Sequence, residues 1–241
     1  MRRAAALALG LCAVLVAREG DSHLRFPTVK AERWIELRLA EEPIRIGYRV
    51  GFGASLAGEL RKSADRDGDF QVSAAEGNAA LDARTAALLG ALSVCTGPTL
   101  GRVSCRRLGP RDIERVEAEG WTPGPSGHLH FSWTLRLREH AREIGAIRLE
   151  DAYDVPGVEI SDVQIDRPPH SPLKRAGDAA MAAGVAERFN WVERLREPGP
   201  RVVVAAWTPP KSRGPALWLA ATCVVIGGLV VWLFWRRGKL R

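Results

Sequence analysis

The sequence predicts an α+β fold, in which an exported, antiparallel β-sandwich-like domain carries an inserted helix-loop-helix and precedes one C-terminal transmembrane helix. Three observations lead to this prediction. Several stretches alternate apolar and polar residues with a period of two, as half-buried strands do. Two stretches of helical periodicity flank an acidic loop of twelve residues. A long apolar run lies near each end of the 241-residue chain.

The N-terminus has the pattern of a secretory signal, because a short basic head precedes an apolar run from Ala4 to Ala17. A helix over this run would be about 21 Å long, which is too short for a bilayer core of about 30 Å. Small residues at Gly20 and Ser22 suit cleavage, so residues 1–22 are predicted to be the signal peptide. Cleavage after Ala17 and an uncleaved anchor are the alternatives.

The exported domain is predicted over residues 23–207, and it opens with a hairpin. Apolar residues alternate with polar ones over 35–39 and again over 44–52, and the residues 40–43 between them suit a turn. Helices are expected over 54–64 and 74–93 because apolar residues recur there at spacings of three and four.

More strands should follow the helices. The clearest alternation covers 129–137, and weaker candidates cover 147–153, 158–165 and 201–207. Residues 167–190 suggest a long connection with one Ala-rich helical turn. Residues 208–215 are rich in Pro and predict a stiff linker.

The apolar run at 216–235 predicts a membrane span, because twenty uncharged residues of helix measure about 30 Å. Trp residues lie near both ends of the run, and a basic tail follows at 236–241. This tail is therefore expected in the cytoplasm and the body of the protein outside it. A sorting tail that is removed after export would have a similar sequence.

Charge gives little indication of a nucleic-acid partner. The formal net charge is +7, but most of the excess lies at the two ends of the chain rather than in a basic stripe of the folded domain. A nucleic-acid binder needs such a stripe. The sequence therefore excludes nucleic acid and leaves the membrane as the expected partner surface.

Two cysteines fall within the exported domain, Cys95 and Cys105. An oxidising compartment favours a disulfide between them, and the residues that separate them include Gly and Pro, which suit a turn. Two free thiols remain the alternative.

One motif carries chemistry, the twelve-residue stretch DRDGDFQVSAAE from Asp65 to Glu76. Acidic side chains occupy its first, third, fifth and twelfth positions, and Val72 is the apolar residue at the eighth. This stretch resembles the EF-hand calcium loop, and the resemblance extends over the flanking helices, about residues 54–93. Calcium prefers six to eight oxygen ligands, and the resemblance implies that one calcium ion is bound by Asp65, Asp67, Asp69, Gln71 (through its carbonyl), Ser73 and Glu76.

The loop departs from the family pattern at its sixth position, where Phe70 replaces the usual Gly. The family uses Gly because the chain turns there with a positive φ. A lone loop of this kind implies a weak site, with a dissociation constant of roughly 0.1–1 mM. Two other interpretations stay open: a degenerate loop, and a polar turn in which Ser73 and Glu76 only form a helix-capping box.

A looser resemblance concerns the whole exported part. The stretches 23–29, 65–76 and 149–160 are similar to the extracytoplasmic region that precedes some bacterial nickel-permease-like membrane proteins. It implies a permease or another envelope protein as a partner, and an accessory role in metal or solute transport as the alternative function. No nucleophile or nucleotide-binding motif is present, so no enzymatic activity is expected.

Overall fold

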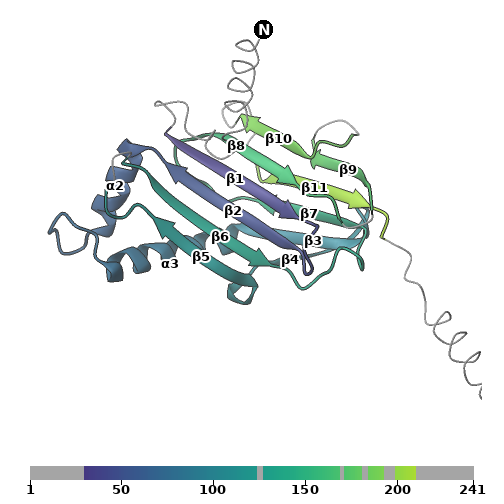
Figure 1. Cartoon of the computed structure of the whole chain (residues 1–241), viewed down its shortest axis with the longest axis horizontal. Helices are drawn as coiled ribbons and strands as arrows, with labels where there is room; N and C mark the ends of the chain where they lie inside the picture. The colour runs from purple at the N-terminus through teal and green to yellow at the C-terminus, as the bar shows by residue number, and fades with distance from the viewer. Residues whose placement is uncertain (1–29, 124–126, 169–170, 181–183, 193–198, 210–241) are drawn as a thin grey trace, which may run out of the picture.

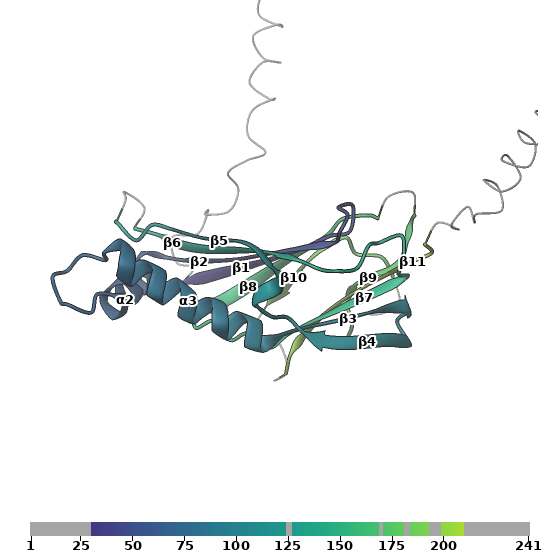
Figure 2. The same cartoon turned by 90° about the horizontal axis from the view of Figure 1, so that it is seen from below.

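The computed structural model describes residues 30–123, 127–168, 171–180, 184–192 and 199–209. They form a mixed α+β fold made mostly of strands, arranged as two sheets (Figures 1 and 2). The predicted signal peptide and the predicted membrane span at 216–235 lie outside the described residues. Within those residues, no helix is long and apolar enough to cross a membrane.

The first sheet has six strands in the order β10-β8-β1-β2-β6-β5. Its strands are β1 (Ala31–Arg38), β2 (Arg45–Phe52), β5 (Ile113–Glu119), β6 (Leu129–Arg136), β8 (Val158–Ile165) and β10 (Arg188–Val192). β1 and β2 form the predicted hairpin, with Ile35 opposite Tyr48. β1 and β8 run parallel, which corrects the prediction of an antiparallel sheet.

The second sheet has five strands in the order β4-β3-β7-β11-β9, all paired antiparallel. Its strands are β3 (Leu92–Thr99), β4 (Arg102–Arg107), β7 (Ala146–Asp151), β9 (Leu173–Asp178) and β11 (Arg201–Trp207). Residues 167–190 therefore contain β9 and the start of β10, and the predicted long connection was wrong. Both strands lie at the edges of their sheets, where backbone pairing needs no regular apolar pattern.

The two sheets share one hydrophobic core, to which alternate residues of each strand contribute. Trp133 and Phe131 of β6, Ile35 of β1 and Val203 of β11 are all at most 1% exposed. This alternation is the physical reason that the period-two pattern predicted the central strands correctly.

A charged cluster is buried within this core. The Asp151 carboxylate of β7 lies 3.5 Å from the Arg33 guanidinium of β1 and 3.8 Å from that of Arg201 on β11. The Tyr48 hydroxyl donates to Asp151 at 3.1 Å. Arg33 and Arg201 also donate to the backbone carbonyl of Tyr153, at 2.8 and 3.2 Å. The cluster thus connects the two sheets and holds the start of the β7–β8 connection.

The described residues form two α-helices, α2 (Ala54–Ala64) and α3 (Ala74–Ala91), and a short 3-10 turn at Pro110–Asp112. α3 runs along the inner side of the six-stranded sheet towards β3, while α2 lies at one end of that sheet (Figure 2). The Trp133 indole donates to the Thr85 hydroxyl of α3 at 2.8 Å, and Leu88 and Leu89 of α3 enter the core. α3 ends two residues earlier than predicted, because Leu92 is already the first residue of β3 and pairs with Asp151 of β7.

Candidate metal centre

The loop between α2 and α3 begins and ends at residues that cap the helices. Asp65 is the C-cap of α2, and its backbone N–H bonds the Arg61 carbonyl. Ser73 is the N-cap of α3, and it forms the predicted capping box with Glu76. These caps fix both ends of the loop. The loop itself projects at one end of the molecule (Figures 1 and 2).

Asp65 lies at the centre of the curl of the loop. Its two carboxylate oxygens accept hydrogen bonds from the backbone N–H groups of Gly68 and Phe70, both at 2.9 Å. Gly68 has φ +74° and Phe70 has φ +66°. The loop thus turns at its sixth position in the left-handed region, where the family pattern uses Gly, although this residue is Phe70. Its side chain is 97% exposed, so no packing compensates for the backbone strain.

Glu76 reaches back from the first turn of α3 into the loop. One oxygen accepts from the Arg66 N–H at 2.6 Å, and the other from the Ser73 N–H and hydroxyl at 2.9 and 2.8 Å. These hydrogen bonds lower the pKa of Glu76 to about 2, and the bond from the Arg66 N–H has the largest effect. Glu76 is thus an anion at every pH well above this value.

Three carboxylates converge on one point. One oxygen each of Asp65, Asp67 and Glu76 lies within 4.8 Å of the other two, and no other such group of metal-binding side chains occurs in the part of the chain that the structure describes. Calcium binds its oxygens at about 2.3–2.6 Å, so one ion can contact oxygens separated by this distance. The pKa of Asp67 is raised above its ordinary value. A hydrogen bond from the Asp69 N–H lowers it, but desolvation and the negative charges of Asp69 and Glu76 together raise it by more.

Of the other predicted ligands, Asp69 does not belong to this group of three carboxylates. Its carboxylate accepts a hydrogen bond from the Gln71 N–H at 2.8 Å, and the Ser73 hydroxyl donates to Glu76 at 2.8 Å.

A hollow of about 450 Å³ beside the loop was not foreseen from the sequence. Glu76 and Arg66 line it from the loop side, and Tyr153 and Asp154 from the β7–β8 connection. Local sequence patterns hold no signal for this neighbourhood, because the two segments are far apart in the chain. Contacts with distant residues, among them hydrogen bonds from Arg33 and Arg201 to the Tyr153 carbonyl, hold the β7–β8 connection in place.

The predicted disulfide is confirmed. Cys95 of β3 and Cys105 of β4 face each other in register, and their sulfurs are 2.09 Å apart. The bond closes the hairpin at the edge of the five-stranded sheet.

Comparison with known proteins adds no family to this description. No protein-family model matches the chain, and no curated protein matches it significantly.

Proposed function

We propose that this protein is a membrane-anchored, extracytoplasmic binding module whose loop at 65–76 binds one calcium ion. The single observation that carries the proposal is the convergence of Asp65, Asp67 and Glu76 oxygens within 4.8 Å of one another. It agrees with the EF-hand-like spacing of the sequence. The anchor is the predicted span at 216–235.

The chemistry of the group favours a divalent cation over other ligands. Three carboxylates that lie this close repel one another when they are ionised, and a cation between them removes this repulsion. Carboxylate oxygens suit calcium, and the loop can supply further oxygens from Asp69, the Gln71 carbonyl and Ser73.

The role of the ion is proposed to be structural. The loop joins α2 to α3, and α3 contributes Leu88 and Leu89 to the core. An ion held by Asp65 at the end of α2 and by Glu76 at the start of α3 would fix the angle between the helices. Extracytoplasmic calcium is abundant and steady, so even a dissociation constant of roughly 0.1–1 mM would keep the site largely filled.

Calorimetry of the full chain in detergent tests this proposal. Calcium titration up to about 5 mM should give saturable binding and raise the melting temperature, because the ion binds only the folded loop. Glu76→Gln should abolish or strongly weaken binding while α3 keeps its cap, since Gln also serves a capping box. Glu159→Gln, at an exposed carboxylate elsewhere, is the matched control.

Two results would contradict the proposal. One is the absence of any calcium-dependent heat or stabilisation in the parent protein. The other is binding that Glu76→Gln leaves equal to that of the control, which would place the ion elsewhere on the chain.

A further inference from the structure

The outer face of the six-stranded sheet carries a hollow that is separate from the calcium loop. Its volume is about 370 Å³, within the range of ligand sites, roughly 300–1,000 Å³. No described helix or strand covers this face in either view (Figures 1 and 2). The face lies on the opposite side of the sheet from the hydrophobic core.

Strand register arranges the residues of this face in two rows that cross the sheet, and all members of the two rows except Asn190 line the hollow. Every position in both rows except Gly47 bears a side chain that can donate or accept hydrogen bonds, including Trp34 through its indole N–H. In order from β10 to β5, the first row is Arg188, Gln164, Glu36, Gly47, Thr134 and Arg115, and the second is Asn190, Asp162, Trp34, Arg49, Ser132 and Glu117.

Gly47 of β2 lies at the floor of the hollow. It has no side chain, and the ends of the Glu36 and Arg38 side chains lie over it, 3.2 and 3.4 Å from where a Cβ would stand. At Gly51 the far edge of the Trp34 indole, Cη2, lies 3.2 Å from where a Cβ would stand. The indole therefore leans over Gly51 along the sheet. It is partly exposed and lines the hollow, so it offers an aromatic surface beside hydrogen-bonding groups.

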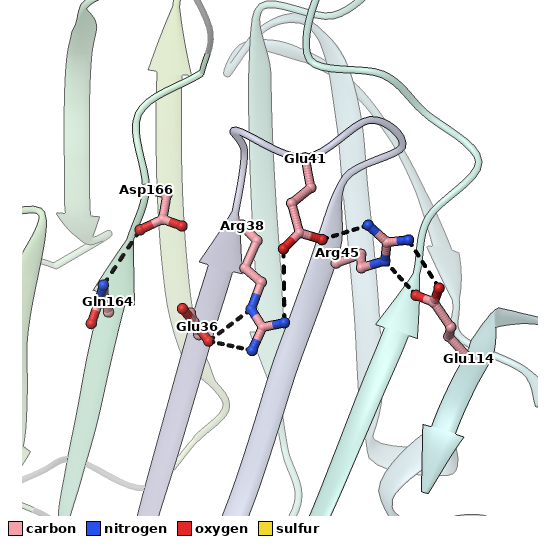
Figure 3. Close-up of polar contacts among 7 residues, drawn as sticks. All are labelled: Glu36, Arg38, Glu41, Arg45, Glu114, Gln164 and Asp166. Atoms are coloured by element: carbon pink, nitrogen blue, oxygen red, sulfur yellow. Dashed lines mark hydrogen bonds and ion pairs between the residues drawn. The ribbon is translucent and has the colours of Figure 1, made fainter. Parts of the chain in front are cut away.

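The charges around the hollow nearly balance. Three carboxylates and four guanidiniums line it, and Glu36 pairs with Arg38 at 2.7 Å while Glu117 pairs with Arg115. The Glu36–Arg38 pair continues through Glu41 and Arg45 to Glu114 at the end of the sheet (Figure 3). A field of one sign, which would attract a polyanion or polycation, is therefore absent among these described groups.

Hydrogen-bonding capacity nevertheless remains for a ligand. Among the described residues, no hydrogen bond or ion pair joins Arg49 or Arg188 to another side chain, and both line the hollow. Free donors beside an aromatic surface, within a ring of nearly balanced charge, suit a ligand that is uncharged and rich in hydroxyl groups. Its hydroxyls would bond the guanidinium and carboxylate groups, and the apolar face of its rings would pack on Trp34.

We propose that this hollow, with Gly47 at its floor and Trp34 beside it, is a binding site for an uncharged polysaccharide chain. The site does not depend on the calcium loop, which lies at the end of the molecule.

Calorimetry tests the site with the full chain in a polyoxyethylene detergent, because a maltoside headgroup is itself a sugar. The probes are uncharged hexasaccharides of glucose, N-acetylglucosamine, mannose and galactose. Each is used at about 10 mM, ten times a dissociation constant of about 1 mM. At least one should bind. Trp34→Ala should weaken that binding about tenfold by removing the stacking surface.

Gly47→Gln is the second variant, and it should abolish binding by filling the hollow. A Cβ there would lie 3.2 Å from a Glu36 carboxylate oxygen and 3.4 Å from the Arg38 guanidinium, both of which can move aside. It would also lie 3.4 Å from the Glu36 Cβ, which is ordinary van der Waals contact. Gly58→Gln on α2 is its matched control, because nothing lies within 4 Å of a Cβ at that position. Glu76→Gln should bind the saccharide like the parent, so the two proposals succeed or fail separately.

Three outcomes would overturn the inference. They are no binding by any of the four saccharides, binding that Gly47→Gln and Gly58→Gln alter equally, and stronger binding of polygalacturonate than of every uncharged probe. The last result would assign the face to an anion.

Discussion

At the scale of the residue, Phe70 holds an unfavourable backbone conformation within the proposed calcium loop. It is the only non-glycine residue with a positive φ among those described, and the residue is 97% exposed. A bulky residue in this region carries strain of about 1–3 kcal/mol. The turn nevertheless forms, because the Phe70 N–H bonds the Asp65 carboxylate at 2.9 Å.

Phe70→Gly should therefore raise calcium affinity, by about tenfold for each 1.4 kcal/mol of strain removed from the ion-bound loop. Phe70→Ala is the matched control, because it removes the same ring but keeps the Cβ that causes the strain. Calcium titration of both variants checks the prediction. An equal gain in both would assign the effect to the ring, and unchanged binding in Phe70→Gly would refute the strain argument.

At the scale of the elements, the buried cluster around Asp151 determines how β1, β7 and β11 fit together. Asp151 is fully buried between two arginines, one from each sheet. Burial also raises the pKa of Tyr48 well above its ordinary value, so its hydroxyl remains a donor to Asp151.

Asp151→Asn should destabilise the fold by about 3–5 kcal/mol, because it leaves two buried guanidinium charges without their anion. Glu150→Gln is the control: it is the preceding residue of β7, its side chain bonds Ser93 and Arg148 near the surface, and its loss should cost less than about 1 kcal/mol. Urea unfolding measures both values. Similar midpoints for the two variants would show that the buried charge is not required.

At the scale of the whole molecule, the Cys95–Cys105 bond fixes an edge that little else holds. β4 pairs only with β3 among the described strands, and its residues are exposed or half-buried. The core therefore contributes little to the attachment of β4, and the disulfide carries that role.

Reduction of this bond should lower the free energy of unfolding by about 3 kcal/mol, the value that the chain-entropy model gives for so short a loop. Denaturant unfolding with and without a thiol-free reductant checks this. A Cys95→Ala/Cys105→Ala double variant should unfold like the reduced protein and should not respond to reductant. An unchanged unfolding midpoint after complete reduction would contradict the prediction.

The sequence by itself determined the elements whose side chains are sorted between core and solvent. β1, β2 and β6 alternate along their length, β8 and β11 were predicted with their observed bounds, and α2 and α3 follow from helical spacing. The acidic loop could likewise be predicted, because its chemistry is local: twelve consecutive residues hold the spacing, the caps and the turn.

Only the tertiary structure decided the rest. The four edge strands, β4, β5, β9 and β10, were missed because an edge strand pairs on one side and needs no regular apolar alternation. β3 was missed as well, and the parallel pairing of β1 with β8 was not foreseen. The Asp151 cluster and the hollow over Gly47 consist of residues from distant strands. Their proximity follows from strand order and register, and the local sequence pattern does not specify either of these.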